Sequence, residues 1–256
     1  MLSLLPAELR RIGAEMARYP SEIVVSVLVL IILFYGFFVG AGYVAGAMPG
    51  FGERIDTLIV GYVVWTLVLG SLTSVSGDLD VDARAGVLQQ VFMSSYGPLR
   101  VFVSRTIANM LITTAITVGV LVAILLLTGR RLSIPVTAVL PTVGILLGSF
   151  GIAFLVGSLT LWLKQVRQLI NLGQFVLLFL VMTPFETLSE SLRLARYVLP
   201  VVPGIGVLRD LLIRNELHWD SLSLAILNGA IYTLLGLVVF RSSISKVRRS
   251  GSLGWY

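Results

Sequence analysis

The residue types that most often carry chemistry are scarce in this sequence. Its 256 residues include no cysteine and one histidine, His218. The chain therefore has no disulfide or thiolate metal site, and a zinc centre or a serine hydrolase built on several histidines is not expected. Charged residues do gather in one internal stretch, where Asp78, Asp80, Asp82 and Arg84 fall within seven positions.

These acidic residues are well placed to begin a helix. Acids in a first turn are favoured by the helix dipole, and one of them can cap the turn. Gly97 and Pro98 then end the segment. The spacing predicts an amphipathic helix over residues 80–96, with an apolar stripe formed by Val81, Ala85, Leu88, Phe92 and Tyr96. Such a stripe can dock on a partner protein or rest on lipid headgroups, and periodicity leaves both open.

The composition around this polar stretch is that of a membrane protein. Hydrophobic residues make up 57% of the chain and charged residues 12%, against about 25% charged in a soluble domain. The formal charge of +6 fits the excess of Lys and Arg in cytoplasmic loops better than it fits nucleic-acid binding. No nucleic-acid partner is expected, and membrane lipids are.

The charge-poor intervals predict an all-α integral membrane protein with six transmembrane helices. A bilayer core of about 30 Å needs roughly 20 apolar helical residues. The intervals that meet or approach this length are residues 23–46, 57–77, 101–128, 135–163, 168–185 and 221–240. The interval 168–185 is the shortest and begins with polar residues. We expect a single permease-like membrane domain, because no repeat or soluble domain interrupts the chain.

Three segments outside these spans have their own character. Residues 5–19 predict an amphipathic helix that lies in the membrane interface or docks on a partner. Residues 186–212 follow Pro184 and contain Pro200 and Pro203, which favours a re-entrant pair of half-helices over a surface loop with one amphipathic helix. Residues 241–256 form a basic tail. The loops that share a side with both termini hold more Lys and Arg, so both termini are expected in the cytoplasm.

Glycines recur at four-residue spacing in two of the predicted spans. Small residues at this spacing allow helices to approach closely, within one chain or between two chains. The glycines concerned are Gly36, Gly40, Gly42, Gly46, Gly144 and Gly148.

The order of these features resembles a known family. The six spans, the interfacial helix, the run "ARAGVLQQVFMSSYGPLRVFVSR" and the run "LRLARYVLPVVPGIGVLRDLL" are similar to those of ABC-2 type permeases. These permeases are the membrane subunits of ATP-binding-cassette exporters, found in the prokaryotic plasma membrane. The resemblance covers residues 6–249 and rests on the order and spacing of degenerate motifs.

The resemblance implies roles for several segments. Residues 80–95 would be a coupling helix that docks on an ATPase subunit, through Asp80, Val81, Arg84, Ala85, Leu88, Gln89 and Phe92. The family commonly has a glutamate where this chain has Gln89, which leaves a hydrogen bond there but no ion pair. Residues 186–212, with Pro184, Pro200 and Pro203, would form an outer gate.

Polar residues in the interval 168–185 mark a further candidate site. Helical spacing places one face of this segment at Gln168, Asn171, Phe175, Leu178 and Met182, with Gln174 at its edge. Amide groups in a membrane must pair across helices or meet water. The resemblance implies that this face lines the transport pathway or the seam between two permease copies. Amide contacts between helices of one chain are the alternative.

The source of energy follows from what the sequence lacks. It contains no GxxxxGK[ST] phosphate loop, so ATP and Mg²⁺ are expected on a separate ATPase subunit, present in two copies, and no cofactor or metal on this chain. The apolar cores of the spans carry no charged residue, which disfavours ion coupling and an embedded catalytic site. No catalytic residues are expected in this chain.

Together these observations predict the permease half of an exporter, paired with a second copy or a homologue. Apolar walls without charge favour an amphipathic drug-like compound or a lipid as substrate, with a polysaccharide or lipid-linked glycan as the second choice. A passive channel or membrane scaffold without an ATPase is the alternative from another class.

Overall fold

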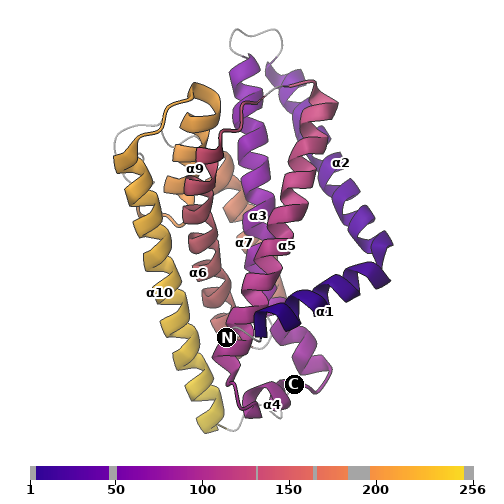
Figure 1. Cartoon of the computed structure of the whole chain (residues 1–256), viewed down its shortest axis with the longest axis vertical. Helices are drawn as coiled ribbons and strands as arrows, with labels where there is room; N and C mark the ends of the chain where they lie inside the picture. Colours follow the sequence, from indigo (N-terminus) through magenta and orange to yellow (C-terminus); the bar gives the residue numbers. More distant parts are fainter. Residues whose placement is uncertain (1–3, 46–50, 131, 164–165, 184–196, 251–256) are drawn as a thin grey trace.

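The chain is described by a computed structural model (Figure 1) that covers all residues except 1–3, 46–50, 131, 164–165, 184–196 and 251–256. Within these described residues the structure is helical and contains no β-strand. The helices are α1 (Leu4–Arg18), α2 (Pro20–Ala45), α3 (Phe51–Arg84), α4 (Leu88–Met93), α5 (Pro98–Thr128), η1 (Val136–Ala138), α6 (Val139–Leu163), α7 (Arg167–Met182), α9 (Val202–Arg209), η3 (Asp210–Arg214) and α10 (Trp219–Ser250).

Five of these helical segments are long and apolar enough to cross a membrane. They are Pro20–Gly40, Ile55–Arg84, Pro98–Thr128, Val136–Leu163 and Trp219–Arg249. The prediction of an all-α membrane protein is thus confirmed at this level, and the apolar helices indicate a multi-pass chain. The sixth predicted span is represented by α7, whose 16 residues extend about 24 Å.

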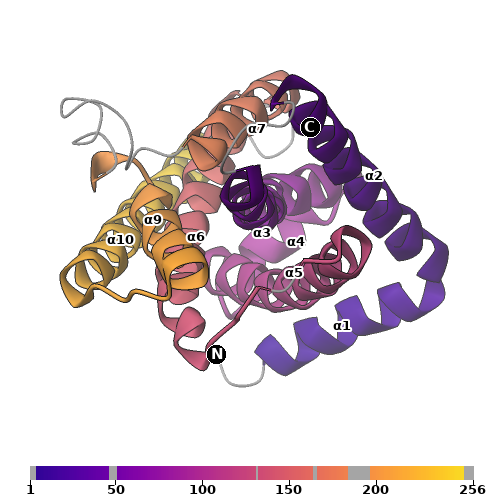
Figure 2. The ribbon, with the colours of Figure 1, turned by 90° about the horizontal axis from the view of Figure 1, so that it is seen from above.

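Helix α3 occupies the centre of the bundle. Seen from above, α5, α6 and α7 surround it, and α2 stands further out (Figure 2). Fully buried side chains such as Ile59, Tyr62 and Val68 line its length. An apolar helix is buried over most of its surface only when other helices cover it, and α3 is the most buried of the candidate spans.

Helices α6 and α10 pack along most of their length through glycine contacts. A Cβ atom on Gly151 would overlap the backbone of Tyr232, and one on Gly236 would overlap the carbonyl oxygen of Gly151. Gly144 faces the backbone of Ala225 at 3.3 Å from its would-be Cβ, whereas Gly148 faces Val201 at 3.2 Å. The glycine pattern of residues 144–151 therefore serves close backbone contact inside one chain.

The glycines of α2 behave differently. A Cβ on Gly36 or Gly40 would meet no described atom within 4 Å. The surroundings of Gly42 are not described, and Gly46 lies outside the described residues. Helix α2 touches the bundle mainly at Phe34, whose ring meets Tyr62 of α3 edge-on at 5.2 Å. Gly36 and Gly40 therefore do not mediate close packing within the described chain.

The predicted helix over residues 80–96 is wrong in its boundaries. Helix α3 continues without a break through the acidic cluster to Arg84, and the separate helix α4 spans only Leu88–Met93. Gly86 has a φ of 69°, a left-handed conformation that ends a helix. The acids therefore lie at the end of a long helix. This helix ends near Gly86, and not at Gly77 or Asp78, where the predicted span 57–77 ended.

The end of the chain also differs from the sequence-based boundaries. The predicted span 221–240 and the first part of the predicted tail form one continuous helix, α10, which ends at Ser250. Of the predicted gate, residues 184–196 lie outside the described part, including Pro184. The remainder consists of α9 and the single π-type turn η3, with Pro203 buried in the first turn of α9 and Pro200 half-buried before it.

Candidate functional site

A cleft opens between α3, α6 and α7 near the end of the bundle where α4 lies. Its volume is about 560 Å³. The residues that line it are Thr73, Ser76, Gly77, Asp80, Arg84, Thr160, Val166, Gln168, Ile170 and Asn171. Five of these ten residues carry a hydroxyl or amide group, which can donate and accept hydrogen bonds without bringing a net charge.

The charged residues of the cleft neutralise each other. Arg84 donates from Nε to Asp80 Oδ1 at 3.0 Å, one helical turn apart on α3. Their side chains are 67% and 46% exposed, so this pair lies at the rim rather than in the interior. An exposed pair of this kind contributes little to stability, which leaves it available for contacts with a ligand or a partner.

The cleft joins two groups of residues that the sequence placed in separate sites. Asp80 and Arg84 belong to the predicted coupling segment, and Gln168 and Asn171 belong to the predicted pathway face. They meet because the first turns of α7 lie beside the last turns of α3. Sequence reasoning missed Thr73, Ser76 and Thr160, although the change from apolar to hydroxyl residues after Leu72 was a usable signal.

The predicted pathway face of α7 is not uniform. Gln168, Asn171 and Phe175 are exposed, whereas Leu178 and Met182 pack against the core around α3. The edge residue Gln174 accepts a hydrogen bond through its backbone oxygen from Trp65 Nε1 at 3.3 Å. The helix is thus open near its start and closed against α3 near its end.

Arg209 caps the C-terminal end of α7. Its side chain is only 6% exposed, and its guanidinium donates to the carbonyl oxygens of Val181 and Thr183. Gly61 of α3 leaves room for it, since a Cβ there would lie 3.2 Å from Arg209 Nη2. A cation on the last carbonyls of a helix satisfies acceptors and offsets the dipole. This role could not be predicted from the sequence, because a single arginine outside the predicted spans does not reveal its burial.

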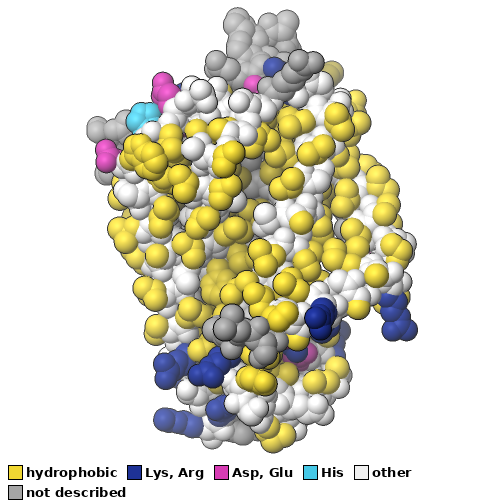
Figure 3. Space-filling view, in the orientation of Figure 1, with side chains coloured by type: hydrophobic (Ala, Val, Ile, Leu, Met, Phe, Trp, Pro, Cys, Tyr) yellow, Lys and Arg dark blue, Asp and Glu magenta, His cyan; other side chains and the backbone are white. Residues whose placement is uncertain are grey.

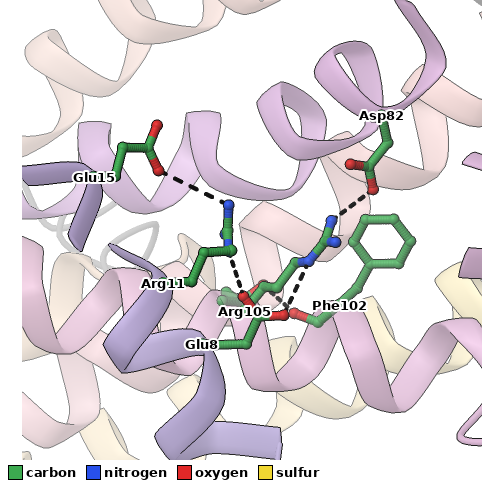
Figure 4. Close-up of polar contacts among 7 residues, drawn as sticks. Glu8, Arg11, Glu15, Asp82, Phe102 and Arg105 are labelled. Carbon is green, nitrogen blue, oxygen red and sulfur yellow. Dashed lines mark hydrogen bonds and ion pairs between the residues drawn. The ribbon is translucent and has the colours of Figure 1, made fainter. Parts of the chain in front are cut away.

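A second polar feature ties α1 to the bundle. Arg105 of α5 lies between Glu8 of α1 and Asp82 of α3 (Figure 4). Its Nη1 is 2.6 Å from Asp82 Oδ2, and its Nε is 3.3 Å from Glu8 Oε1. Arg11 also contacts Glu8, from Nε to Oε2 at 2.7 Å. Arg105, Glu8 and Asp82 are each 13–14% exposed, so water screens this network poorly.

Asp78 belongs to the same network. Its Oδ2 atom is buried and has no hydrogen-bond partner among the described residues. The acidic cluster of the sequence therefore divides between two faces of α3. Asp78 and Asp82, four residues apart, turn toward α1 and α5, whereas Asp80 and Arg84 turn toward the cleft.

Helix α4 buries the residues that were expected to dock on a partner. Leu88 is 3% exposed and Phe92 is 4% exposed, and both join the apolar core formed with α5, α6 and α10. Arg248 of α10 donates to the carbonyl oxygen of Phe92 at 2.8 Å and lies 6.0 Å from its ring centroid. The prediction that Leu88 and Phe92 face outward is wrong, because an amphipathic stripe shows which side is buried but not against what.

The outward surface of this region is formed by other residues. We use the term connector for residues 85–97, which join α3 to α5. Val81 just before the connector is 64% exposed, Met93 is 78% exposed and Tyr96 is 47% exposed. Ala85, Gln89 and Gln90 are exposed as well. Any partner that meets the connector in this conformation meets these side chains.

No cluster of His, Cys, Asp and Glu suited to a metal ion occurs among the described residues. No protein-family model matches the sequence, and no curated protein matches it.

Proposed function

We propose that the chain is the membrane-spanning subunit of an ATP-driven exporter that moves an amphipathic compound or a lipid out of the cell. One observation carries the proposal: the polar cleft and the connector share the last turn of α3. Asp80 and Arg84 line the cleft, and the chain enters the connector immediately after Arg84. A displacement of the connector therefore changes the cleft directly.

The packing of α4 suits it to transmit force. Its buried side, Leu88, Val91 and Phe92, is fixed to the core, and Arg248 holds the carbonyl oxygen of Phe92. Interiors packed at this density transmit small displacements rather than absorb them. A push on the exposed side of the connector would move α3 and α5 together with α4.

The cleft suits an amphipathic ligand. Its hydroxyl and amide groups can bind an uncharged or zwitterionic polar part, and the lining residues Val166 and Ile170 can contact an apolar part. Near the far end of α7, Arg209 binds the last carbonyl oxygens of the helix, and Leu178 and Met182 pack against the core around α3. This is the arrangement of an inward-open transporter if the cleft faces the cytoplasm.

The orientation and the number of crossings form part of the proposal. Lys and Arg side chains gather at the lower end of the molecule, below a broad apolar belt (Figure 3), and the positive-inside rule would put that end in the cytoplasm. Helix α7 runs antiparallel to α3 from the level of Asp80 to that of Gly61, and would serve as the sixth crossing. Two copies, or one copy and a homologue, would bind two ATPase subunits in a prokaryotic plasma membrane.

The test is whether an ATPase binds through the exposed side of the connector. The tagged chain is purified from its own membranes in mild detergent, and ATP hydrolysis in the eluate is measured with and without EDTA. We expect Mg²⁺-dependent hydrolysis with the native chain and at least about a tenfold loss with Met93→Asp, since a charge there opposes an apolar contact. Val136, 89% exposed at the other end of the bundle, supplies the matched control Val136→Asp.

Two results would contradict the proposal. Recovery of no ATPase with the native chain would favour a passive channel or a scaffold. Equal loss with Met93→Asp and Val136→Asp would show that the connector is not the docking surface. Because both side chains are exposed, neither substitution disturbs the core, and a thermal unfolding curve of each variant verifies this.

A further inference from the structure

We propose that the C-terminal end of α10 binds the headgroup of an anionic phospholipid. The inference requires only that the chain crosses a membrane, and it stands apart from the proposed exporter role. The site is a shallow hollow of about 310 Å³ whose lining consists of Arg241, Ser242, Ser245, Lys246 and Arg249.

The hollow continues an apolar stripe of the same helix. Exposed side chains at Ile231, Leu234, Leu235 and Val238 follow helical spacing along the outer side of α10. The same three- and four-residue steps lead from Val238 to Arg241, Ser242, Ser245 and Arg249. One side of α10 therefore presents an apolar surface for acyl chains that leads directly to a cationic surface.

The cations of the hollow have no ion-pair partner among the described residues. No carboxylate among the described residues pairs with Arg241, Lys246 or Arg249. Other cations at the surface of the chain do have partners, as Arg84 has Asp80 and Arg214 has Asp210. The neighbouring Arg248 turns inward to Phe92 and does not line the hollow. Three positive charges without an ion-pair partner in the described part of the chain thus line one small space.

A tryptophan next to the hollow indicates the depth of the hollow relative to the membrane. Trp162 at the end of α6 is 48% exposed, and Lys246 Nζ lies 5.1 Å from its ring centroid. Tryptophan side chains concentrate at the headgroup level of a bilayer, and Figure 3 shows the Lys and Arg side chains of this end directly below the apolar belt. The hollow therefore lies where lipid phosphates lie.

The ligand chemistry follows from these groups. A guanidinium binds a phosphodiester through two parallel hydrogen bonds, and a lysine adds a point charge. Ser242 and Ser245 now donate to the backbone oxygens of Val238 and Arg241, so their hydroxyl oxygens can accept from a lipid glycerol headgroup. The contiguous apolar stripe favours a phospholipid over free phosphate.

The test is a binding titration of the full chain in detergent. Native mass spectrometry counts bound phosphatidylglycerol and phosphatidylcholine for the native chain and for Arg241→Gln/Arg249→Gln. Each basic residue near an anionic lipid surface strengthens the attraction. The double variant is therefore expected to bind phosphatidylglycerol at least about tenfold more weakly than the native chain. Phosphatidylcholine binding should stay unchanged. Arg130→Gln/Arg214→Gln is the control, because it removes the same charge from paired sites away from the cleft and the hollow.

Three outcomes would overturn the inference. They are equal affinity for the two lipids, unchanged phosphatidylglycerol binding in the double variant, and an equal loss in the control variant. Displacement of phosphatidylglycerol by millimolar inorganic phosphate would instead identify a free-anion site and contradict the lipid assignment. Equal thermal unfolding of the variants establishes that the fold is retained.

Discussion

The two faces of the last turns of α3 carry similar residues in opposite situations. On one face Asp78 and Asp82 are enclosed by α1 and α5, and Asp82 binds Arg105 at 2.6 Å. On the other face Asp80 binds Arg84 at 3.0 Å in the rim of the cleft, where both side chains are largely exposed. The chemistry of the two ion pairs is the same. Their burial differs, and burial decides which pair contributes strongly to the stability of the fold and which contributes little.

The strongest test of this contrast is the removal of each arginine. Arg105→Gln leaves three poorly exposed acids, Glu8, Asp78 and Asp82, without their shared cation. Breaking a buried ion pair from one side is expected to lower the free energy of unfolding by about 3–5 kcal/mol. Arg84→Gln removes an exposed partner and is expected to cost less than about 1 kcal/mol. Thermal and denaturant unfolding in detergent would measure both, and equal effects would contradict the contrast.

The matched acids give a second, smaller comparison. Asp82→Asn weakens a short charge-assisted bond to Arg105 and is expected to destabilise the chain by about 1.5–3 kcal/mol. Asp80→Asn at the rim is expected to change stability by less than about 1 kcal/mol. The two substitutions lie two residues apart on one helix, so helix propensity is held constant. A larger loss with Asp80→Asn than with Asp82→Asn would reverse the assignment of the faces.

The cleft face can be tested by filling it. A Cβ on Gly77 would meet no described atom within 4 Å, so Gly77→Leu projects into the cleft without a clash. Replacing a helical glycine favours the helix by roughly 0.5–1 kcal/mol. We therefore expect equal or higher thermal stability together with about tenfold weaker binding of a fluorescent phospholipid analogue.

Gly70 on the same helix supplies the control for that experiment. A Cβ there would lie 2.6 Å from the Thr113 Cγ2 atom, so Gly70→Leu should lower stability. Unchanged probe binding in Gly77→Leu would show that the cleft does not receive the lipid analogue.

The smallest expected effect concerns Asp78. Its Oδ2 atom has no hydrogen-bond partner in the described part of the chain, while Arg105 and Arg11 attract its charge and Asp82 and Glu8 repel it. Asp78→Asn removes both sets of interactions and the cost of burying a charge. We expect a change in unfolding free energy below about 1 kcal/mol, clearly smaller than that of Asp82→Asn. A loss as large as that of Asp82→Asn would make Asp78 an essential member of the network.

The helical class and most apolar spans could be predicted from the sequence, because hydropathy over twenty residues depends little on tertiary detail. The boundaries near Asp80 could not, since acids suit either the start of a helix or a polar surface on one that continues. Leu88 and Phe92 could be recognised from the sequence as part of an apolar stripe that becomes buried. The surface that covers this stripe could not be predicted. Likewise, Gly36 and Gly144 belong to the same four-residue spacing motif. Whether each one allows close helix packing depends on the helices around it, which the motif does not reveal.

The candidate site was partly visible in the sequence. Gln168 and Asn171 were identifiable as polar residues in an apolar segment, as were Asp80 and Arg84. Their meeting in one cleft depends on α7 lying antiparallel to α3, which is a property of the whole bundle. Arg209 was missed for the same reason, because its carbonyl partners lie 26 and 28 residues away in the chain.

The glycine contact between α6 and α10 constrains the order of assembly during synthesis. Helix α6 is translated before α7, α9 and α10, so the surface around Gly144 and Gly151 meets lipid until its partner arrives. Lipid tails cannot match the close approach of another backbone at such a surface. A chain that lacks α10 would therefore leave the surface around Gly144 and Gly151 without its partner helix. The completion of this bundle depends on its last helix.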